Sequence, residues 1–114
     1  MNSGCIFCKI IAGEIPTREV HRSDDCVAIA DANPQAPEHF LVLPVQHVKN
    51  FSQYVASTDP AIAGRLFGVA AHVGREHSKN GFRVVVNEGA DGGQTVEHLH
   101  VHVLGGRHMH WPPG

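Results

Sequence analysis

Several features are scarce in this chain, and each scarcity excludes a class of protein. No apolar run approaches the roughly 20 residues that span a bilayer. The formal charge is −2, without the surplus of Lys and Arg that attracts nucleic acid or an anionic membrane. Cysteine occurs three times, an odd number that argues against a disulfide framework. The first residues, Met1–Cys5, lack the charged and apolar regions of a signal peptide. We therefore expect a cytoplasmic protein whose thiols stay reduced.

The pattern of apolar residues predicts a single domain over residues 1–114. Hydrophobic residues make up 42% of the chain and charged residues 18%, which suits one globular core. A short helix is expected over residues 5–11, and a long one begins at Asp59-Pro60, a capping pair followed by an apolar stripe. Short β-like runs occur at Val20–Ser23, Cys26–Ala30, Phe40–Leu43, Arg83–Val86 and His98–Leu104. The expected fold is α+β, with a five-stranded antiparallel sheet, one long helix and one short helix.

Histidine is the most unusual component, with ten in the chain, and three of them alternate with aliphatic residues over His98–Leu104. Successive side chains of a strand point to opposite faces, so this spacing predicts His98, His100 and His102 on one face. Leu99, Val101 and Val103 then lie on the other face. Imidazoles can donate, accept, bind a metal or take a proton near neutral pH. The strand is therefore predicted to be a reaction centre rather than an ordinary polar face.

A glycine-rich segment leads into this strand and ends in Gly93, Gln94 and Thr95. Its glycines allow the backbone to approach a ligand closely and to turn N–H groups toward an anion. Asn87, Gln94 and Thr95 add uncharged donors at its two ends. Such donors beside three imidazoles suit a phosphate group that a nucleophile must also reach. A flexible hairpin loop is the alternative interpretation.

The His98–Leu104 run resembles the His-φ-His-φ-His-φ-φ signature of the histidine-triad (HIT) superfamily of nucleotide-binding proteins. The ending Trp111-Pro112-Pro113-Gly114 is similar to the Hint branch rather than to the dinucleoside polyphosphate hydrolases. Further blocks that resemble this branch are Asp31 with Pro34–Pro37, His39–Val42, Val85–Gly89, Gly92–Gln94, Val103–Arg107 and Met109–Gly114.

The resemblance implies a hydrolase that cleaves the phosphorus–nitrogen bond of purine nucleoside 5′-phosphoramidates, such as AMP-amide or aminoacyl adenylates. His100 matches the nucleophile, which forms a covalent nucleotidyl-histidine intermediate. His102 matches the residue that binds phosphate oxygen and assists protonation of the leaving group. His39 matches a fourth histidine that orients the nucleophile or relays protons to it, and His98 completes the triad.

The resemblance also implies a nucleotide-binding site. Asp31 matches the carboxylate that accepts the two ribose hydroxyls, and Asn87 and Thr95 match phosphate-binding positions, with Gly93 and Gln94 beside them. Two positions depart from the common pattern, because Thr95 stands where Ser is frequent and Ile29 where an aromatic residue is frequent. The base pocket is expected from Ile6, Phe7, Ile10 and Ile29, with Leu41 nearby.

Cys5-x-x-Cys8 has the spacing of two zinc ligands on one turn, although a lone pair can also be two buried thiols. The resemblance to bacterial-type family members implies that His47 and His98 complete a structural zinc site that catalysis does not require. In that case His98 is a structural ligand without a direct part in the chemistry. A third interpretation treats His98, His100 and His102 as the ligands of a catalytic zinc.

The resemblance further implies a homodimer that joins two sheets into one of ten strands, with the tail from Arg107 to Trp111 reaching the partner's site. The expected binding partners are small purine nucleotides. We expect no binding to nucleic acid or to a membrane. Two alternative functions remain, a nucleotide-binding regulatory or scaffold protein with incidental activity and a dinucleoside polyphosphate hydrolase.

Overall fold

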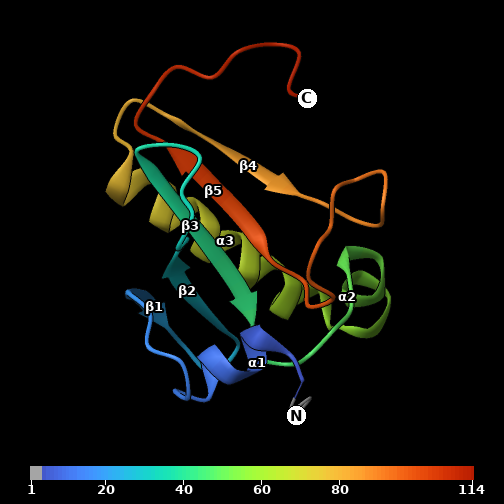
Figure 1. Cartoon of the computed structure of the whole chain (residues 1–114). Coiled ribbons are helices and arrows are strands. Elements are labelled where there is room, and N and C mark those ends of the chain that lie inside the picture. Colours follow the sequence, from blue (N-terminus) through green and yellow to red (C-terminus); the bar gives the residue numbers. More distant parts are fainter. Residues whose placement is uncertain (1–3) are drawn as a thin grey trace.

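The computed structural model describes residues 4–114, so part of the expectation about the first five residues lies outside the described residues. Three helices and five strands follow one another along the chain (Figure 1). In order they are α1 (Ile6–Ile11), β1 (Glu19–Arg22), β2 (Cys26–Ala30), β3 (Glu38–Pro44), α2 (Phe51–Ser57), α3 (Pro60–His77), β4 (Phe82–Val86) and β5 (Val101–Gly105).

The strands form one antiparallel sheet in the order β1-β2-β3-β5-β4. The α+β class and the five-stranded antiparallel sheet are thus confirmed. Strand β5, which carries the end of the histidine run, lies between β3 and β4 (Figure 1). In the described structure β4 and β1 are the edge strands, and Val84 on β4 is an exposed apolar side chain.

The sheet is covered on both faces at its centre. On one face, Phe40 and Val42 of β3 pack with Leu66, Ala70 and Val73 of α3. On the other face, Leu41 and Leu43 of β3 pack with side chains of α1, namely Phe7, Cys8, Ile10 and Ile11. Strand β3 is therefore buried along most of its length, which explains its continuous apolar sequence.

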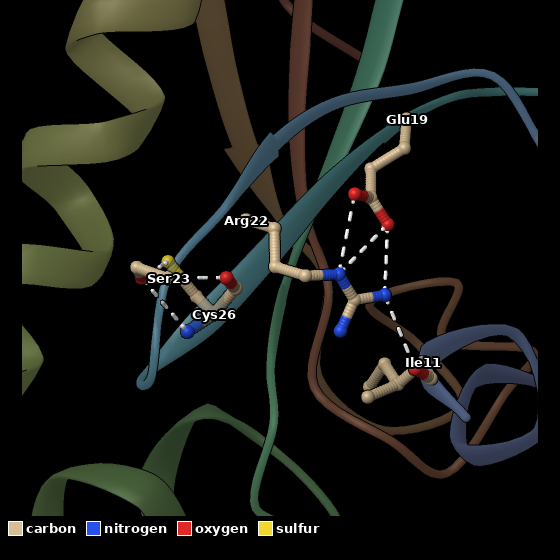
Figure 2. Close-up of polar contacts among 5 residues, drawn as sticks. All are labelled: Ile11, Glu19, Arg22, Ser23 and Cys26. Carbon is tan, nitrogen blue, oxygen red and sulfur yellow. Dashed lines mark hydrogen bonds and ion pairs between the residues drawn. The ribbon is translucent and has the colours of Figure 1, made fainter. Parts of the chain in front are cut away.

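Helix α1 is too short to be stable alone, so its position depends on tertiary contacts. The apolar face of the helix provides some of these contacts. Arg22 of β1 also holds the end of the helix, because its Nη2 donates to the Ile11 carbonyl at 3.1 Å (Figure 2). The same guanidinium donates to the Glu19 carboxylate, at 2.8 Å from Nη2. The third cysteine, Cys26, lies next to Ser23 in this hairpin and packs in the core as a small apolar residue.

Two expectations about the elements were wrong. Helix α2 was not predicted, because Tyr54 is its one buried residue and no apolar stripe marks it. Its start is set by the Asn50 side chain, which accepts from the Gln53 N–H at 2.8 Å. Strand β5 begins at Val101 rather than at His98. The preceding segment hydrogen-bonds elsewhere, since the Leu99 N–H donates to the Val48 carbonyl at 2.9 Å.

Helix α3 begins as predicted. Pro60 occupies its first turn, and the Asp59 carboxylate accepts from the Ala61 N–H at 2.8 Å. The apolar stripe of this helix faces the sheet, with Leu66 and Val73 buried. Within residues 4–114, no helix is long and apolar enough to cross a membrane.

Gly74 of α3 tests how tightly this helix packs on the sheet. A Cβ at Gly74 would lie 2.5 Å from the Phe82 ring, whereas one at Gly68 of the same helix would meet nothing within 4 Å. We expect Gly74→Ala to destabilise the fold by about 1–3 kcal/mol through overpacking. Gly68→Ala, the matched control, should stabilise it by roughly 0.5–1 kcal/mol through helix propensity. Urea unfolding measures both, and equal effects of the two variants would contradict the packing described for Gly74.

Candidate active site and metal centre

The histidine run keeps its predicted alternation although only its last part is strand. Leu99, Val101 and Val103 all lie in the core beneath α3. The histidines lie on the α1 side, where the Phe7 ring contacts the rings of His98 and His100 at centroid distances of 5.8 and 5.0 Å. His102 is displaced along β5 toward His39 of β3, with a ring centroid distance of 5.2 Å. The three imidazoles therefore share a face but have different neighbours.

The hydrogen bond of His100 determines which of its nitrogens is nucleophilic. Its Nδ1 lies 2.8 Å from the main-chain carbonyl oxygen of His98. A carbonyl can only accept, so Nδ1 carries the proton and the Nε2 of neutral His100 has a free lone pair. The residue is 7% exposed and lines a pocket together with His102. A positioned, unprotonated imidazole nitrogen in a pocket is the arrangement that a nucleophile needs.

His39 and His102 form a directed pair. The Gln35 N–H donates to His39 Nδ1 at 3.0 Å, so in neutral His39 the proton is on Nε2. His39 Nε2 lies 2.9 Å from His102 Nδ1 and donates to it. The proton of neutral His102 is therefore on its own Nε2, the nitrogen opposite the pair. Hydrogen bonds thus run from the Gln35 N–H to His39 and from His39 to His102. The Nε2–H of His102 is the donor at the end of this chain.

Burial keeps both rings of this pair neutral. It lowers the pKa of His39, and the negative charge of Asp31 partly opposes that effect. Burial, followed by the nearby His100 and His39, lowers the pKa of His102 to about 4. At neutral pH each ring consequently has one proton, as the hydrogen-bond order requires.

Asp31 follows β2 directly and is tied to β3, because its N–H donates to the His39 carbonyl at 2.9 Å. Its Oδ1 accepts from the Asn33 N–H at 2.8 Å, which closes a local turn. Its Oδ2 lies 3.4 Å from His39 Nε2. The carboxylate is thus fixed in the pocket wall beside the histidine pair.

A pocket of about 240 Å³ lies between α1 and the sheet and brings together much of the predicted nucleotide site. Its apolar wall contains all four residues predicted for the base, Ile6, Phe7, Ile10 and Ile29, and Leu41. Among its polar residues are Asp31, Thr95, His100 and His102, all of them predicted for the site. Sequence analysis missed its remaining lining residues, which are Thr17, Ala30, Ala32 and Val96.

Other predicted residues lie away from the pocket wall. His39 reaches it only through Asp31 and His102, and Asn87, Gly93 and Gln94 do not line it. The Gln94 side chain is used within the protein, since its Nε2 donates to the Lys49 carbonyl at 2.8 Å and its Oε1 accepts from the Gly89 N–H at 3.1 Å. Gly93 has a φ of +80°, a conformation that glycine adopts without strain.

The expectation that the glycine-rich loop turns its N–H groups toward an anion was wrong for three of them. The N–H groups of Gly89, Gly93 and Gln94 donate within the loop, to Gln94 Oε1, the Ala90 carbonyl and the Gly89 carbonyl. These bonds satisfy the backbone of a turn rather than a ligand. The loop is thus closed by its own hydrogen bonds and leads into Thr95, which lines the pocket.

Cys5, Cys8, His47 and His98 meet at the start of α1, as predicted, with their ligand atoms within 4.8 Å of one another. His98 Nδ1 lies 3.3 Å from Cys5 Sγ and 3.6 Å from Cys8 Sγ, and His47 Nδ1 lies 3.4 Å from Cys8 Sγ. Sulfur and nitrogen ligands of a tetrahedral zinc are about 3.5 Å apart, so the four residues fit the ion.

The outer hydrogen bond of His98 supports the same conclusion. Its Nε2 donates to the Pro44 carbonyl at 2.9 Å, which leaves the Nδ1 lone pair facing the two sulfurs. Burial lowers the pKa of His98 and so favours the neutral ring that a metal requires. Cys5, Cys8 and His98 are buried, and His47 is half-buried.

Asp31, His39 and His102 also bring three ligand atoms within 4.8 Å, but their hydrogen bonds oppose a metal. The Gln35 N–H occupies His39 Nδ1, so His39 Nε2 carries a proton where an ion would need a lone pair. The third interpretation, a catalytic zinc on His98, His100 and His102, is not supported either. In the described residues His98 and His102 belong to separate clusters, and His100 belongs to neither.

Comparisons with known proteins agree with this architecture. The HIT domain family model matches residues 12–109. An uncharacterized HIT-like protein of Synechococcus elongatus is 45% identical over the full length of both chains. Protein pkiA of Dictyostelium discoideum is 42% identical, and the match covers 96% of this chain and 88% of that protein.

Two solved structures are particularly informative. A HIT family hydrolase from Legionella pneumophila has a TM-score of 0.90 at 38% identity, with 96% of this chain and 99% of that chain covered. A zinc-bound histidine triad family protein from Mycobacterium smegmatis has a TM-score of 0.78 at 28% identity, with 90% and 75% covered. The family model, the relative matched over its full length and the shared fold together show that the chain belongs to the HIT domain family.

Proposed function

We propose that this protein is a hydrolase of the Hint type that cleaves the phosphorus–nitrogen bond of purine nucleoside 5′-phosphoramidates. The observation that carries the proposal is the hydrogen bond from His100 Nδ1–H to the His98 carbonyl, which leaves His100 Nε2 as a free nucleophile at the pocket. The Legionella neighbour, described as a HIT family hydrolase, supports the reaction class. The Trp111–Gly114 ending supports the Hint type.

The proposed reaction has two displacements at phosphorus. The lone pair of His100 Nε2 forms a nitrogen–phosphorus bond while the bond to the leaving nitrogen breaks. That nitrogen keeps the electron pair, takes one proton from solvent and departs as an amine. Water then attacks phosphorus, the bond to His100 breaks, and one proton of the attacking water is released to solvent. The products are the amine and a nucleoside monophosphate, and His100 is restored.

The remaining pocket residues hold the substrate for this chemistry. The apolar wall of Ile6, Phe7 and Ile29 suits a flat base, and the Asp31 carboxylate suits two ribose hydroxyl donors. His102 lines the pocket, where its Nε2–H would donate to the charge that develops during the displacement, and the Thr95 hydroxyl would donate to a phosphate oxygen. The pocket holds about 240 Å³, and His100 and His102 in its lining are the groups that would meet the phosphate of a bound nucleotide.

His100→Ala tests the nucleophile. Turnover of adenosine 5′-phosphoramidate should fall by at least about 10⁴-fold, because no other group replaces the attacking nitrogen. Nucleotide binding, measured by calorimetry, should persist, because Asp31 and the apolar wall are unchanged. Mass spectrometry of quenched wild-type protein should show one nucleotidyl group per chain, which the variant lacks.

His72→Ala is the matched control, since His72 is an exposed histidine of α3 paired with Glu76. Its turnover should equal that of the wild type. Near-normal turnover by His100→Ala would falsify the proposed mechanism. Binding without turnover by wild-type protein would instead favour the regulatory or scaffold alternative.

We also propose that Cys5, Cys8, His47 and His98 hold a structural zinc ion. When bound, the ion would cross-link the start of α1 to the segment before β5, with no ligand position open for chemistry. The proposal needs reduced thiols and is therefore consistent with a cytoplasmic protein. Among the described residues, Cys5, Cys8 and Cys26 are not joined in a disulfide.

Cys5→Ser/Cys8→Ser should remove the zinc and lower stability, by about 4 kcal/mol where free zinc exceeds its Kd a thousandfold. Elemental analysis and thermal melting measure these effects on untagged protein purified without chelator. Cys26→Ser, which changes a buried cysteine outside the cluster, should retain one zinc per chain. A wild-type content far below one zinc per chain would show that the two cysteines are packing residues.

The third part of the proposal is a homodimer that pairs the two β4 edges into a ten-stranded sheet. Strand β4 has an open edge, and Val84 on it is 39% exposed. The C-terminal tail lies on the same side, because Arg83 Nη2 donates to the His110 carbonyl at 2.9 Å and its guanidinium lies 5.9 Å from the Trp111 ring centroid. Trp111 itself is 81% exposed and available to a partner.

Val84→Lys should convert this dimer to a monomer, because two like charges would meet across the paired edges. Light scattering at micromolar concentration gives the mass directly. Gln46→Lys, the same change of charge at an exposed position after β3, should remain dimeric. A monomeric wild type, or a dimeric Val84→Lys, contradicts the β4 interface.

A further inference from the structure

The Nε2 proton of His39 has two acceptors within reach. Its other ring nitrogen is occupied by the Gln35 N–H, so the neutral ring has no second proton to offer. His102 Nδ1 lies 2.9 Å from His39 Nε2, and Asp31 Oδ2 lies 3.4 Å from it. One proton therefore faces an imidazole lone pair and a carboxylate oxygen, and it can be donated well to only one of them.

The outcome of this competition decides the state of His102. When His39 donates to His102 Nδ1, the proton of neutral His102 must be on Nε2, where it faces the substrate. When His39 turns to Asp31, nothing fixes the proton of His102, because its Nδ1 then lacks a donor. His102 with the proton on Nδ1 would present a lone pair, rather than an N–H, to the leaving nitrogen.

Asp31 is also the group that meets the ribose in the proposed function. Its Oδ1 already accepts from the Asn33 N–H, and the carboxylate lines the pocket. A carboxylate has about four lone-pair sites, so two ribose hydroxyls would occupy two of the roughly three that Asn33 leaves open. A carboxylate so engaged is a weaker competitor for the proton of His39.

We propose that Asp31 couples ribose recognition to catalysis: the bound diol withdraws Asp31 from His39, and His39 then commits its proton to His102. Asp31 is thereby a positioning residue that acts on His102 through His39, in addition to binding the sugar. This inference rests on the proposed function. His39 already donates to His102 at 2.9 Å in this structure, and the bound diol strengthens that donation by removing the competing acceptor, so that His102 Nε2–H is held toward the leaving nitrogen.

The coupling predicts a particular pattern of rate constants. For wild-type protein and an alkylamine leaving group, kcat for the ribonucleoside 5′-phosphoramidate should exceed that for the 2′,3′-dideoxy analogue by about tenfold, equivalent to one hydrogen bond. With a 4-nitrophenyl ester of the same two nucleotides the ratio should be close to one, because that leaving group departs without a proton. If the dideoxy substrates are only misplaced in the pocket, their kcat should be lower than that of the ribonucleotides with both leaving groups. That result would overturn the coupling.

Asp31→Asn separates the two roles of the carboxylate. The Asn33 N–H needs an oxygen acceptor, so the new amide places its nitrogen where Oδ2 was, and that group cannot accept from His39. We expect KM for the ribonucleotide to rise about tenfold or more. We expect kcat for the dideoxy phosphoramidate to rise above the wild-type value, because the competing acceptor is gone.

If Asp31 only binds the sugar, wild type and Asp31→Asn should have equal kcat values with the dideoxy substrate. If the Asp31 carboxylate only stabilises positive charge on the histidines, kcat should be lower in the variant. Either result overturns the proposal. Asp24→Asn, in the exposed turn between β1 and β2, is the matched control and should leave every ratio unchanged.

Nitrogen-15 NMR of the histidine rings provides a readout that does not depend on turnover. Adenosine should move the signals of His39 Nε2 and His102 Nδ1 toward a stronger mutual hydrogen bond, and 2′,3′-dideoxyadenosine should not. Identical spectra with the two nucleosides would overturn the coupling. Absence of turnover by wild type would overturn the proposed reaction, and the NMR comparison would still decide the coupling.

Discussion

The hydrogen bond from His98 Nε2 to the Pro44 carbonyl is the interaction on which the rest of the site depends. It fixes the ring of His98, so that Nδ1 faces Cys5 and Cys8 at the start of α1. The main-chain carbonyl of the same residue accepts from His100 Nδ1. One residue thus anchors the wall of the pocket with its side chain and sets the tautomer of the nucleophile with its backbone.

The two clusters of this face differ in what their outer hydrogen bonds leave free. Around His98 a carbonyl accepts the ring proton, and lone pairs converge on one point. Around His39 a main-chain amide donates to Nδ1, so the ring carries its proton on Nε2 and offers no lone pair there. Clusters that look alike by distance are therefore suited to different occupants, a metal ion in one case and a shared proton in the other.

Much of this arrangement was predictable from local patterns. Cys26–Ala30 was predicted with its observed bounds, and the alternation of Leu99, Val101 and Val103 correctly gave the buried face. Local patterns could not show that the run leaves the sheet before Val101, since the Val48 carbonyl that pairs with Leu99 is distant in the sequence. They also assigned the N–H groups of the glycine-rich loop to a ligand, although those of Gly89, Gly93 and Gln94 donate within the loop.

The contact from Gln35 to His39 illustrates why such a site is difficult to recognise by comparing residue types. Its donor is a peptide N–H at 3.0 Å, and the Gln35 side chain is bonded elsewhere, to the Asn33 carbonyl. Nineteen of the twenty amino acids supply the same donor, and proline alone lacks it. Position 35 can therefore vary freely among relatives while its contribution to the chemistry stays constant. A shared backbone conformation can therefore preserve the tautomer of a histidine even where the neighbouring side chains differ.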